Sequence, residues 1–515
     1  MTRAHAAAPD SHDRKTAVVS AGAALILLII HAEHLAQPAV WDAAMGVFAP
    51  AAWLSRNGFD IPTLVNLPAW QDGGPNVYSL SLVTWITSLT MRIFAVGGAH
   101  IVALHVLHIC AAAVAIGFTY RIASAALGHR AGIGIAAAAT LFPPFLAQTS
   151  QMYLEIPVAL ATSGALWAAL RRKWATAVVW AWFGALCKPT ALVVAAVVAL
   201  AALLSRADPQ GRVPGVGRRI GRAALVLNGP LAVIAVNVWA SSKKGTNPWS
   251  FDYTAYVMDC VARLRTVPDA LLMLGFCSLG GLLTLPRSLG ALASHDDNPN
   301  GRKARAAALC SLLVLAWVGF VLAVPLGGAV QPLLPRHVVA ISGPLLVAGA
   351  AMGALVLPDR WIVAAAVALC AVFAFNSHGR AYPRETRSFA VAERSLGYRS
   401  FLDVQRAAVT WTQQLPVDTT VVYPLPDHYF MHDPLLGWAA APLRNGHCAR
   451  FESPWLHGKL ADYPAGVVLL LTNPYHGGEA LHRVVSQAKR SKGRRVVWLA
   501  RWSSGGYEAT AVEIQ

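Results

Sequence analysis

Apolar stretches long enough to cross a bilayer recur along the first 377 residues, and they constrain the fold more than any other feature. Of the 515 residues, 56% are hydrophobic and 13% are charged, whereas an ordinary soluble domain is about 25% charged. Each crossing needs about 17 to 25 residues. The sequence therefore predicts a mainly α, polytopic transmembrane helical bundle of about 11 spans plus interfacial helices. The expected spans are 16–36, 99–121, 131–148, 156–170, 174–187, 190–205, 223–241, 270–290, 306–325, 337–357 and 361–377.

The composition changes after residue 377, where charged and apolar residues begin to alternate with turn-forming residues. Such a mixture is typical of a water-soluble domain. We predict a transmembrane domain at 1–377, with a first outer loop at about 37–98, and a small α/β domain at 378–515. The elements expected in it are helices near 400–415 and 478–489 and strands at 419–423, 466–471, 495–501 and 507–513.

Basic residues gather in alternate gaps between the expected spans. Because Lys and Arg in short loops favour the cytoplasmic side, this alternation predicts a cytoplasmic N-terminus and a periplasmic C-terminal domain. If the first span is instead a cleaved signal peptide, every later orientation is unchanged. The composition favours a bacterial inner membrane. The basic groups are Arg14 and Lys15, Arg121 and Arg130, Arg171 to Lys173, Arg206 to Arg222, Arg287 to Arg305, and Arg360.

One further apolar segment, Tyr78 to Ala95, does not fit this alternation. Counting it as a span would move the later basic clusters to the outside. We therefore expect it to lie along the membrane surface as an interfacial helix. The alternative is a true span, compensated by another span missed elsewhere.

The net charge of the chain is strongly positive, at +17, with a pI near 9.9. In a soluble protein this charge would suggest a nucleic-acid partner. Here much of the excess lies in the predicted cytoplasmic loops, where anionic lipid head groups attract it. We predict membrane lipids as partners and no nucleic acid.

Two acids are predicted at the outer surface. Asp42 follows the first span and precedes a helix-compatible stretch, so it is either a functional acid or only a helix N-cap; the two roles are compatible. Glu155 opens the fourth span, where an acid is costly unless it is paired or hydrated. Its alternative role is to face the positive end of the helix that it begins, shortly before Pro157.

Cations are predicted on the same side. Lys188 fills a tight turn between two spans, Arg336 and His337 open the tenth, and Lys243 lies in the loop from about 242 to 269. Each could anchor at the interface, which is the simpler interpretation for Lys243. Together with two carboxylates, they could bind an anionic lipid head group.

No metal ligand set and no cofactor are predicted. His31, Glu33 and His34 form an H-x-E-H run, but spacing supplies no third ligand, so a polar helix end is the better interpretation. Dependence on a divalent metal is left open.

Several short motifs occur in an order that resembles the C-type, multi-span glycosyltransferases that use polyprenyl-phosphate sugars. The nearest subgroup contains protein O-mannosyltransferases and the aminoarabinose transferases of lipid A. The resemblance covers about 38–205 and 331–345. Its motifs are Asp42 after the first span, a Pro75 to Tyr78 surface segment, the run Gln148-Thr149-Ser150-Gln151-Met152-Tyr153-Leu154 before Glu155, the turn Leu186-Cys187-Lys188-Pro189, and Pro335-Arg336-His337.

The chain departs from this family at two positions. The family has an Asp-Glu pair in the first loop, whereas Ala43 follows Asp42 here. It also tends to have a Lys-Pro-Pro segment later in that loop, where this chain has Gly73-Gly74-Pro75-Asn76. One phosphate-binding cation is therefore absent or replaced by Lys188, Lys243 or Arg336.

The resemblance implies transfer of a sugar from a polyprenyl-phosphate donor to a lipid, glycan or protein acceptor on the periplasmic face. Chemistry suggests roles for the residues: Asp42 is the general base on the acceptor, and Glu155 orients the acceptor or supports that base. Arg336 and Lys188 bind the donor phosphate, with His337 and Lys243 as further candidates. Direct displacement would invert the anomeric centre. The alternatives are a transporter or flippase for lipid-linked sugars and a ligase that moves a whole glycan.

The proposed base can be tested by Asp42→Asn, which keeps the shape of the side chain but cannot accept the proton. Sugar transfer measured in membranes is expected to fall by about 10²- to 10⁴-fold at unchanged protein abundance. Turnover near the normal rate would remove Asp42 from the mechanism.

Overall fold

The computed structural model divides the chain into two compact units. The first comprises Met1–Glu33 and His105–Ser377, and the second comprises His34–Leu104 and His378–Gln515. The predicted first outer loop therefore falls in the same unit as the predicted C-terminal domain. The structure describes residues 11–39, 43–66, 81–94, 98–205, 214–242, 268–294, 298–323, 335–377, 395–424, 433–443, 446–449, 466–472, 495–504 and 507–515.

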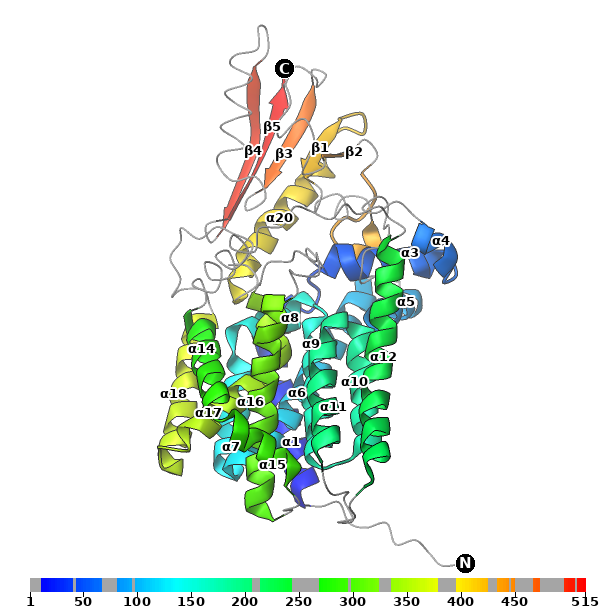
Figure 1. The fold of residues 1–515 in the computed structure, drawn as a ribbon. Helices are drawn as coiled ribbons and strands as arrows, with labels where there is room; N and C mark the ends of the chain where they lie inside the picture. Colours follow the sequence, from blue (N-terminus) through cyan, green and yellow to red (C-terminus); the bar gives the residue numbers. More distant parts are fainter. Residues whose placement is uncertain are drawn as a thin grey trace, which may run out of the picture. The chain divides into compact units, whose positions relative to one another are not determined.

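The described part of the first unit is built of helices, many of which run roughly side by side (Figure 1). Two of them continue another helix across a sharp bend, of 55° between α7 and α8 and of 68° between α14 and α15. The helices are α1 (Ser11–His31), α6 (Ala99–Leu127, which begins in the second unit), α7 (His129–Leu141), α8 (Pro143–Gln151), α9 (Glu155–Leu170), α10 (Trp174–Cys187), η4 (Pro189–Ala191), α11 (Leu192–Leu204), α12 (Val216–Ser242), α14 (Pro268–Leu283), α15 (Leu285–Ala293), α16 (Pro299–Ala323), η6 (Pro335–Ile341), α17 (Ser342–Gly353) and α18 (Asp359–Ser377).

The helices of this unit make the protein a polytopic membrane protein. Among the described residues, six helices are long and apolar enough to cross a membrane, or eight if each bent pair is one span. The predicted count of about 11 is not confirmed. The three remaining expected spans are α9, α10 and α11, whose 16, 14 and 13 residues are fewer than an untilted crossing requires.

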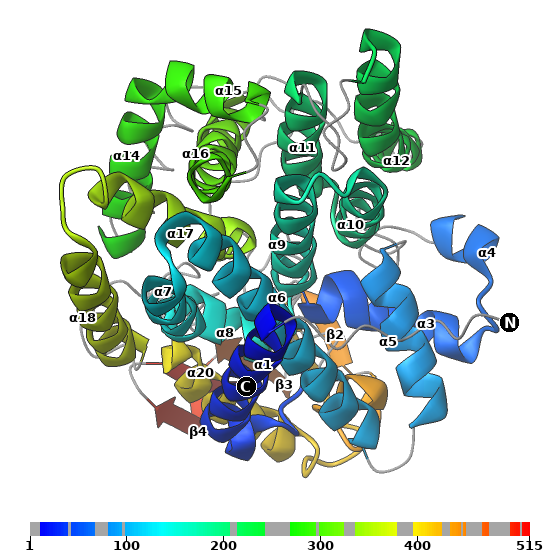
Figure 2. The same ribbon diagram turned by 90° about the horizontal axis from the view of Figure 1, so that it is seen from below.

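Helix α9 lies at the centre of this unit, in contact with α10, α11, α16 and α17 (Figure 2). It is apolar around its whole circumference and nearly all of its residues are buried, as expected for a helix packed on all sides. Small residues allow the close approach: Gly164 lies against the ring of Trp180, and Gly184 of α10 lies against Ala161.

The described part of the second unit combines short helices with one mixed sheet. The sheet has the strand order β2-β1-β3-β5-β4, in which β1 pairs parallel with β2 and β3, and β5 pairs antiparallel with β3 and β4. Its elements are η1 (Ala32–His34, at the unit boundary), η2 (Ala44–Phe48, a π-helix), α3 (Ala49–Arg56), α4 (Ile61–Asn66), α5 (Leu82–Ile93), η7 (Leu396–Tyr398), α20 (Arg399–Thr412), β1 (Val421–Pro424), η8 (Pro434–Leu436), β2 (Gly446–Ala449), β3 (Val467–Thr472), β4 (Val496–Ser504) and β5 (Tyr507–Ile514).

The predicted α/β character of the C-terminal region is confirmed. Helix α20 packs against β4 and β5, with Phe401 edge-on to Tyr507 at a centroid distance of 5.7 Å. Strands β1, β3, β4 and β5 match the four predicted strands to within a few residues. Strand β2 was not predicted, and the helix expected near 478–489 lies outside the described residues.

The first outer loop and the C-terminal region belong to one unit because side chains tie them together across the sequence. Each of these interactions joins a residue within the loop or just after it to the short segment around η8. They are the bond from Trp438 Nε1 to Ala39 O (2.8 Å), the contact of His100 Nε2 with Leu435 O (2.8 Å), and the ion pair of Arg56 with Asp433.

The segment expected at the membrane surface forms α5, a helix of 12 residues. At 1.5 Å per residue it is about 18 Å long, well short of the roughly 30 Å hydrocarbon core. Its polar residues Thr84 and Thr87 are buried, whereas Leu89 and Ile93 are 51% and 62% exposed. An apolar face directed away from the protein fits a helix that lies in the membrane interface.

A glycine in this unit provides a test of its packing. Gly437 has a φ of +83°, and a Cβ there would overlap Ile101 Cδ1. Gly437→Ala is expected to reduce the free energy of unfolding by about 3 kcal/mol, because backbone strain and overpacking add. Gly466 has the same φ with open space around it, so Gly466→Ala should cost only about 1 kcal/mol. Thermal unfolding in detergent measures both, and equal shifts in Tm would show that Ile101 moves aside without cost.

Candidate functional site

Three of the predicted site residues meet at one end of α9. Lys188 Nζ donates to Glu155 Oε1 over 2.6 Å, and Arg336 Nε lies 3.7 Å from the same oxygen. The three residues come from separate parts of the chain, and each is at most 5% exposed. The structure therefore joins one predicted acid and two predicted cations into a single buried cluster, named below the Glu155 cluster.

The position of Glu155 follows from a turn between α8 and α9. Met152, at the end of α8, is completely buried and has a φ of +56°, in the left-handed region. Residues other than glycine seldom adopt this conformation, and such backbone strain is concentrated at functional sites. The turn lets Glu155 begin α9, where a negative charge also faces the positive end of the helix. The structural alternative considered for Glu155 is thus compatible with its ion pair.

Lys188 owes its position to the proline that follows it. A proline disfavours helical backbone in the preceding residue, and Lys188 is extended, with φ −157° and ψ 132°. It ends α10 and directly precedes η4. This break in the helix turns the lysine side chain toward Glu155 instead of along the helix surface.

Arg336 lies in the 3₁₀ helix η6, directly after Pro335. This helix packs against α8 and α9, and the guanidinium carbon of Arg336 is 5.1 Å from the ring centroid of Tyr153. A ring face attracts a cation that is poorly hydrated. Tyr153 therefore supports the guanidinium beside the carboxylate.

The Glu155 cluster brings a carboxylate and cations together in a buried place, where burying any ion is costly. Among the described residues, Lys188 and Arg336 both lie beside Glu155, and Glu155 Oε2 has no hydrogen-bond donor although it is inaccessible to water. An ammonium and a guanidinium held in this way are the groups that bind carboxylates and phosphates most strongly.

Three predicted site residues remain. His337 follows Arg336 in η6, is half-buried, and lies close enough to Lys188 and Arg336 to interact with their charges. Asp42 and Lys243 lie outside the described residues. The segment directly after Asp42 is the π-helix η2, a rare form that is frequent at functional sites.

Another acid of the first outer loop has a purely local role. Asp60 accepts hydrogen bonds from the Thr63 hydroxyl (2.6 Å) and the Thr63 amide (3.1 Å), and these bonds lower the pKa of its carboxyl. Asp60→Asn is therefore a matched control for the substitution of Asp42, since it removes a carboxylate of the same loop.

One contributor to the cluster was missed at the sequence level. Tyr153 belongs to the motif that precedes Glu155, but nothing in its spacing signals a contact with an arginine 183 positions later. Within the described residues, no group of three His, Cys, Asp or Glu side chains is placed to hold a metal ion.

Solved structures similar to this one are glycosyltransferases of the class that the sequence resembles. ArnT from Cupriavidus metallidurans in the apo state is 14% identical, with 97% of this chain and 98% of that chain covered and a TM-score of 0.39. The same protein bound to undecaprenyl phosphate is 12% identical, with 96% and 97% covered and a TM-score of 0.42. The apo form of the Archaeoglobus fulgidus oligosaccharyltransferase is 13% identical, with 94% and 69% covered and a TM-score of 0.43.

No protein-family model and no curated protein sequence matches this chain significantly. The three TM-scores are below 0.5, so the function proposed below is founded on the site and the sequence and not on these neighbours.

The coupling within the cluster can be measured by a double-mutant cycle. Lys188→Met removes the closer cation and leaves Glu155 with Arg336 at 3.7 Å, so the free energy of unfolding should fall by about 3 kcal/mol. Glu155→Gln should also destabilise, and the double variant should cost clearly less than the sum of the two. Unfolding of the purified protein by heat or SDS checks this. Additive costs would show that the two side chains do not interact in the folded protein.

Proposed function

We propose that this protein is a membrane glycosyltransferase that moves a sugar from a polyprenyl-phosphate donor to an acceptor hydroxyl, with inversion of the anomeric centre. The reaction takes place on the periplasmic side of a bacterial inner membrane. The acceptor is carried by a lipid, a glycan or a protein. The observation that carries the proposal is the buried Glu155 cluster, in which Lys188 and Arg336 are both held beside one carboxylate.

The cluster matches the needs of a phosphate leaving group. Negative charge grows on the departing oxygen during transfer, and fixed cations in a dry site stabilise it strongly. Arg336 offers a planar guanidinium that can bind two phosphate oxygens, and Lys188 offers a compact point charge. Both cations are held in place before a ligand binds, since Glu155 lies beside them.

The proposed sugar transfer is a direct displacement at the anomeric carbon. The acceptor oxygen attacks the anomeric carbon, and its proton passes to the carboxylate of Asp42. The bond between the anomeric carbon and the phosphate oxygen breaks, and its electron pair leaves with the polyprenyl phosphate. Lys188 and Arg336 stabilise that phosphate, with His337 and Lys243 as further contacts.

The geometry supports a more specific role for Glu155 than the sequence suggested. Its hydrogen bond to Lys188 supports the role of a positioning residue for the cations that are proposed to bind the phosphate. A residue of this kind should affect donor binding and turnover through Lys188 and Arg336. An acceptor-orienting residue should change the KM for the acceptor instead.

A transporter of lipid-linked sugars is the second candidate, because the bent pairs α7–α8 and α14–α15 resemble the broken helices of transporters. Transporters commonly place their charged groups near the middle of the bilayer. The residues of the Glu155 cluster lie instead at helix ends or breaks. This difference favours transfer at one side over passage through the bundle.

The proposed function is tested with membrane vesicles, a polyprenyl-phosphate sugar labelled in the sugar, and purified Arg336→Gln. Loss of the guanidinium should lower kcat by about 10²- to 10³-fold, since one charged donor to the leaving group is gone. Arg360→Gln, at an exposed position of α18, is the matched control and should keep normal turnover.

Two outcomes contradict the proposal. One is normal transfer by Arg336→Gln. The other is movement of the labelled donor across the membrane without cleavage of its sugar–phosphate bond, which would identify the protein as a transporter.

A further inference from the structure

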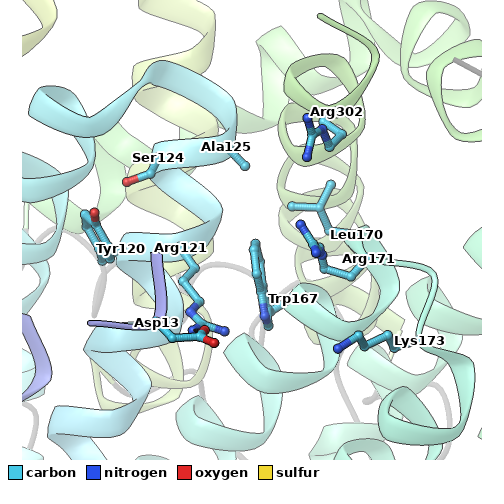
Figure 3. Close-up of a pocket in the computed structure, with 10 residues that line it drawn as sticks. All are labelled: Asp13, Tyr120, Arg121, Ser124, Ala125, Trp167, Leu170, Arg171, Lys173 and Arg302. Atoms are coloured by element: carbon cyan, nitrogen blue, oxygen red, sulfur yellow. Dashed lines mark hydrogen bonds and ion pairs between the residues drawn. The ribbon is translucent and has the colours of Figure 1, made fainter. Parts of the chain in front are cut away.

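A second charged site lies at the opposite end of α9 from the Glu155 cluster. It is a cavity of about 550 Å³ between α1, α6, the turn after α9, and α16 (Figure 3). Its volume is within the range of sites that bind small molecules or head groups, about 300 to 1,000 Å³. Four of its lining residues are cations: Arg121, Arg171, Lys173 and Arg302.

The cavity holds a clear excess of positive charge. Its one acid, Asp13, forms an ion pair with Arg121, whose Nε also donates to Thr16 Oγ1 over 2.8 Å. No acid among the described residues is within ion-pair distance of Arg171, Lys173 or Arg302. Three cations therefore remain for a ligand. Figure 3 shows them around the same opening as Trp167.

The turn that carries Arg171 and Lys173 is held in place by the residue between them. Arg172, between them, has a φ of +54° and is 4% exposed. Its Nη2 donates to Ser294 O over 2.8 Å, so it points away from its neighbours into the protein. With Arg172 held in this way, Arg171 and Lys173 both line the cavity.

The indole of Trp167 forms part of the cavity wall and organises its cations. The guanidinium carbon of Arg121 is 5.2 Å from the ring centroid, and that of Arg171 is 5.6 Å. Cation–π contacts at these distances restrain both arginine side chains. The site is therefore ordered before it binds anything, which distinguishes it from a loop of mobile surface cations.

We propose that this cavity binds the phosphate of an anionic membrane phospholipid, on the side of the membrane that the sequence predicts to be cytoplasmic. Basic pockets between transmembrane helices on that side are suited to the head groups of such lipids. The apolar wall that Trp167 and Leu170 provide fits the glycerol and upper acyl region. The proposed transferase activity is not required for this site.

The general preference of basic residues for the cytoplasmic side does not account for the cavity. That preference requires only that Lys and Arg lie at the cytoplasmic ends of the spans, and exposed positions such as Arg218 in α12 and Arg360 in α18 satisfy it. Here residues from four separated segments converge around one aromatic ring. Such convergence is expected of a binding site.

The test uses the full-length protein, purified in detergent and depleted of lipid, with Lys173→Gln/Arg302→Gln as the variant. Native mass spectrometry measures binding of cardiolipin, with phosphatidylcholine as the zwitterionic comparison. The variant should bind cardiolipin about 30-fold more weakly at low salt, since each of the two lost cations contributes about 1 kcal/mol. Lys173 is exposed and Arg302 is only partly buried, so the fold should survive, which circular dichroism verifies.

Arg218→Gln/Arg360→Gln is the matched control, with the same change of net charge outside the cavity. Its affinity for cardiolipin should stay within about twofold of the unchanged protein. Equal losses in both variants would overturn the proposal, because binding would then depend only on net charge. Sodium pyrophosphate that displaces cardiolipin at micromolar concentration would also overturn it, since the site would then serve a soluble phosphate.

Discussion

A carboxylate that is removed from water must be held by cations or donors, and in this protein that requirement joins three distant segments. Glu155 Oε1 accepts a hydrogen bond from the ammonium of Lys188 and lies near the guanidinium of Arg336. Glu155 begins α9, Lys188 separates α10 from the helices that follow it, and Arg336 lies in η6. Removing one of them would leave a buried charge behind, so the ends of these helices depend on one another.

The charged side chains at the two ends of α9 are stabilised in different ways. At the Glu155 end the ions are buried and lie close together, so salt in the surrounding water screens them little. At the other end the cations line an open cavity and outnumber its single acid. Ligand binding there should weaken with ionic strength, whereas chemistry at the buried end should respond much less. The two proposed anion sites thus lie at opposite ends of one helix and should differ in their response to salt.

The sequence predicted those parts of the fold that follow from local patterns. Hydropathy located an apolar helix for each expected span, and short strand-like runs between turn signals located four of the five strands among the described residues. Strand β2 was missed because Gly446 to Ala449 is short and lacks β-branched residues. At the site, the positive-inside pattern placed Glu155, Lys188 and Arg336 on one side of the membrane, but the contact among them depends on tertiary packing. The same holds for Tyr153, and for the cavity around Trp167, which joins residues that no spacing rule relates.

The length of α9 indicates how deep the proposed reaction site lies in the bilayer. Its 16 residues rise about 24 Å, whereas the hydrocarbon core is about 30 Å thick. The turn from Arg171 to Lys173 is expected at the cytoplasmic interface, because three adjacent cations seldom enter hydrocarbon. Glu155 should then lie roughly 6 Å below the outer edge of the core, in the absence of local thinning of the bilayer. In the proposed function, a lipid-borne phosphate descends from the head-group layer to meet Arg336 and Lys188, and its attraction to these two cations offsets the cost of that descent. This depth explains why the acid is held by side chains instead of by water.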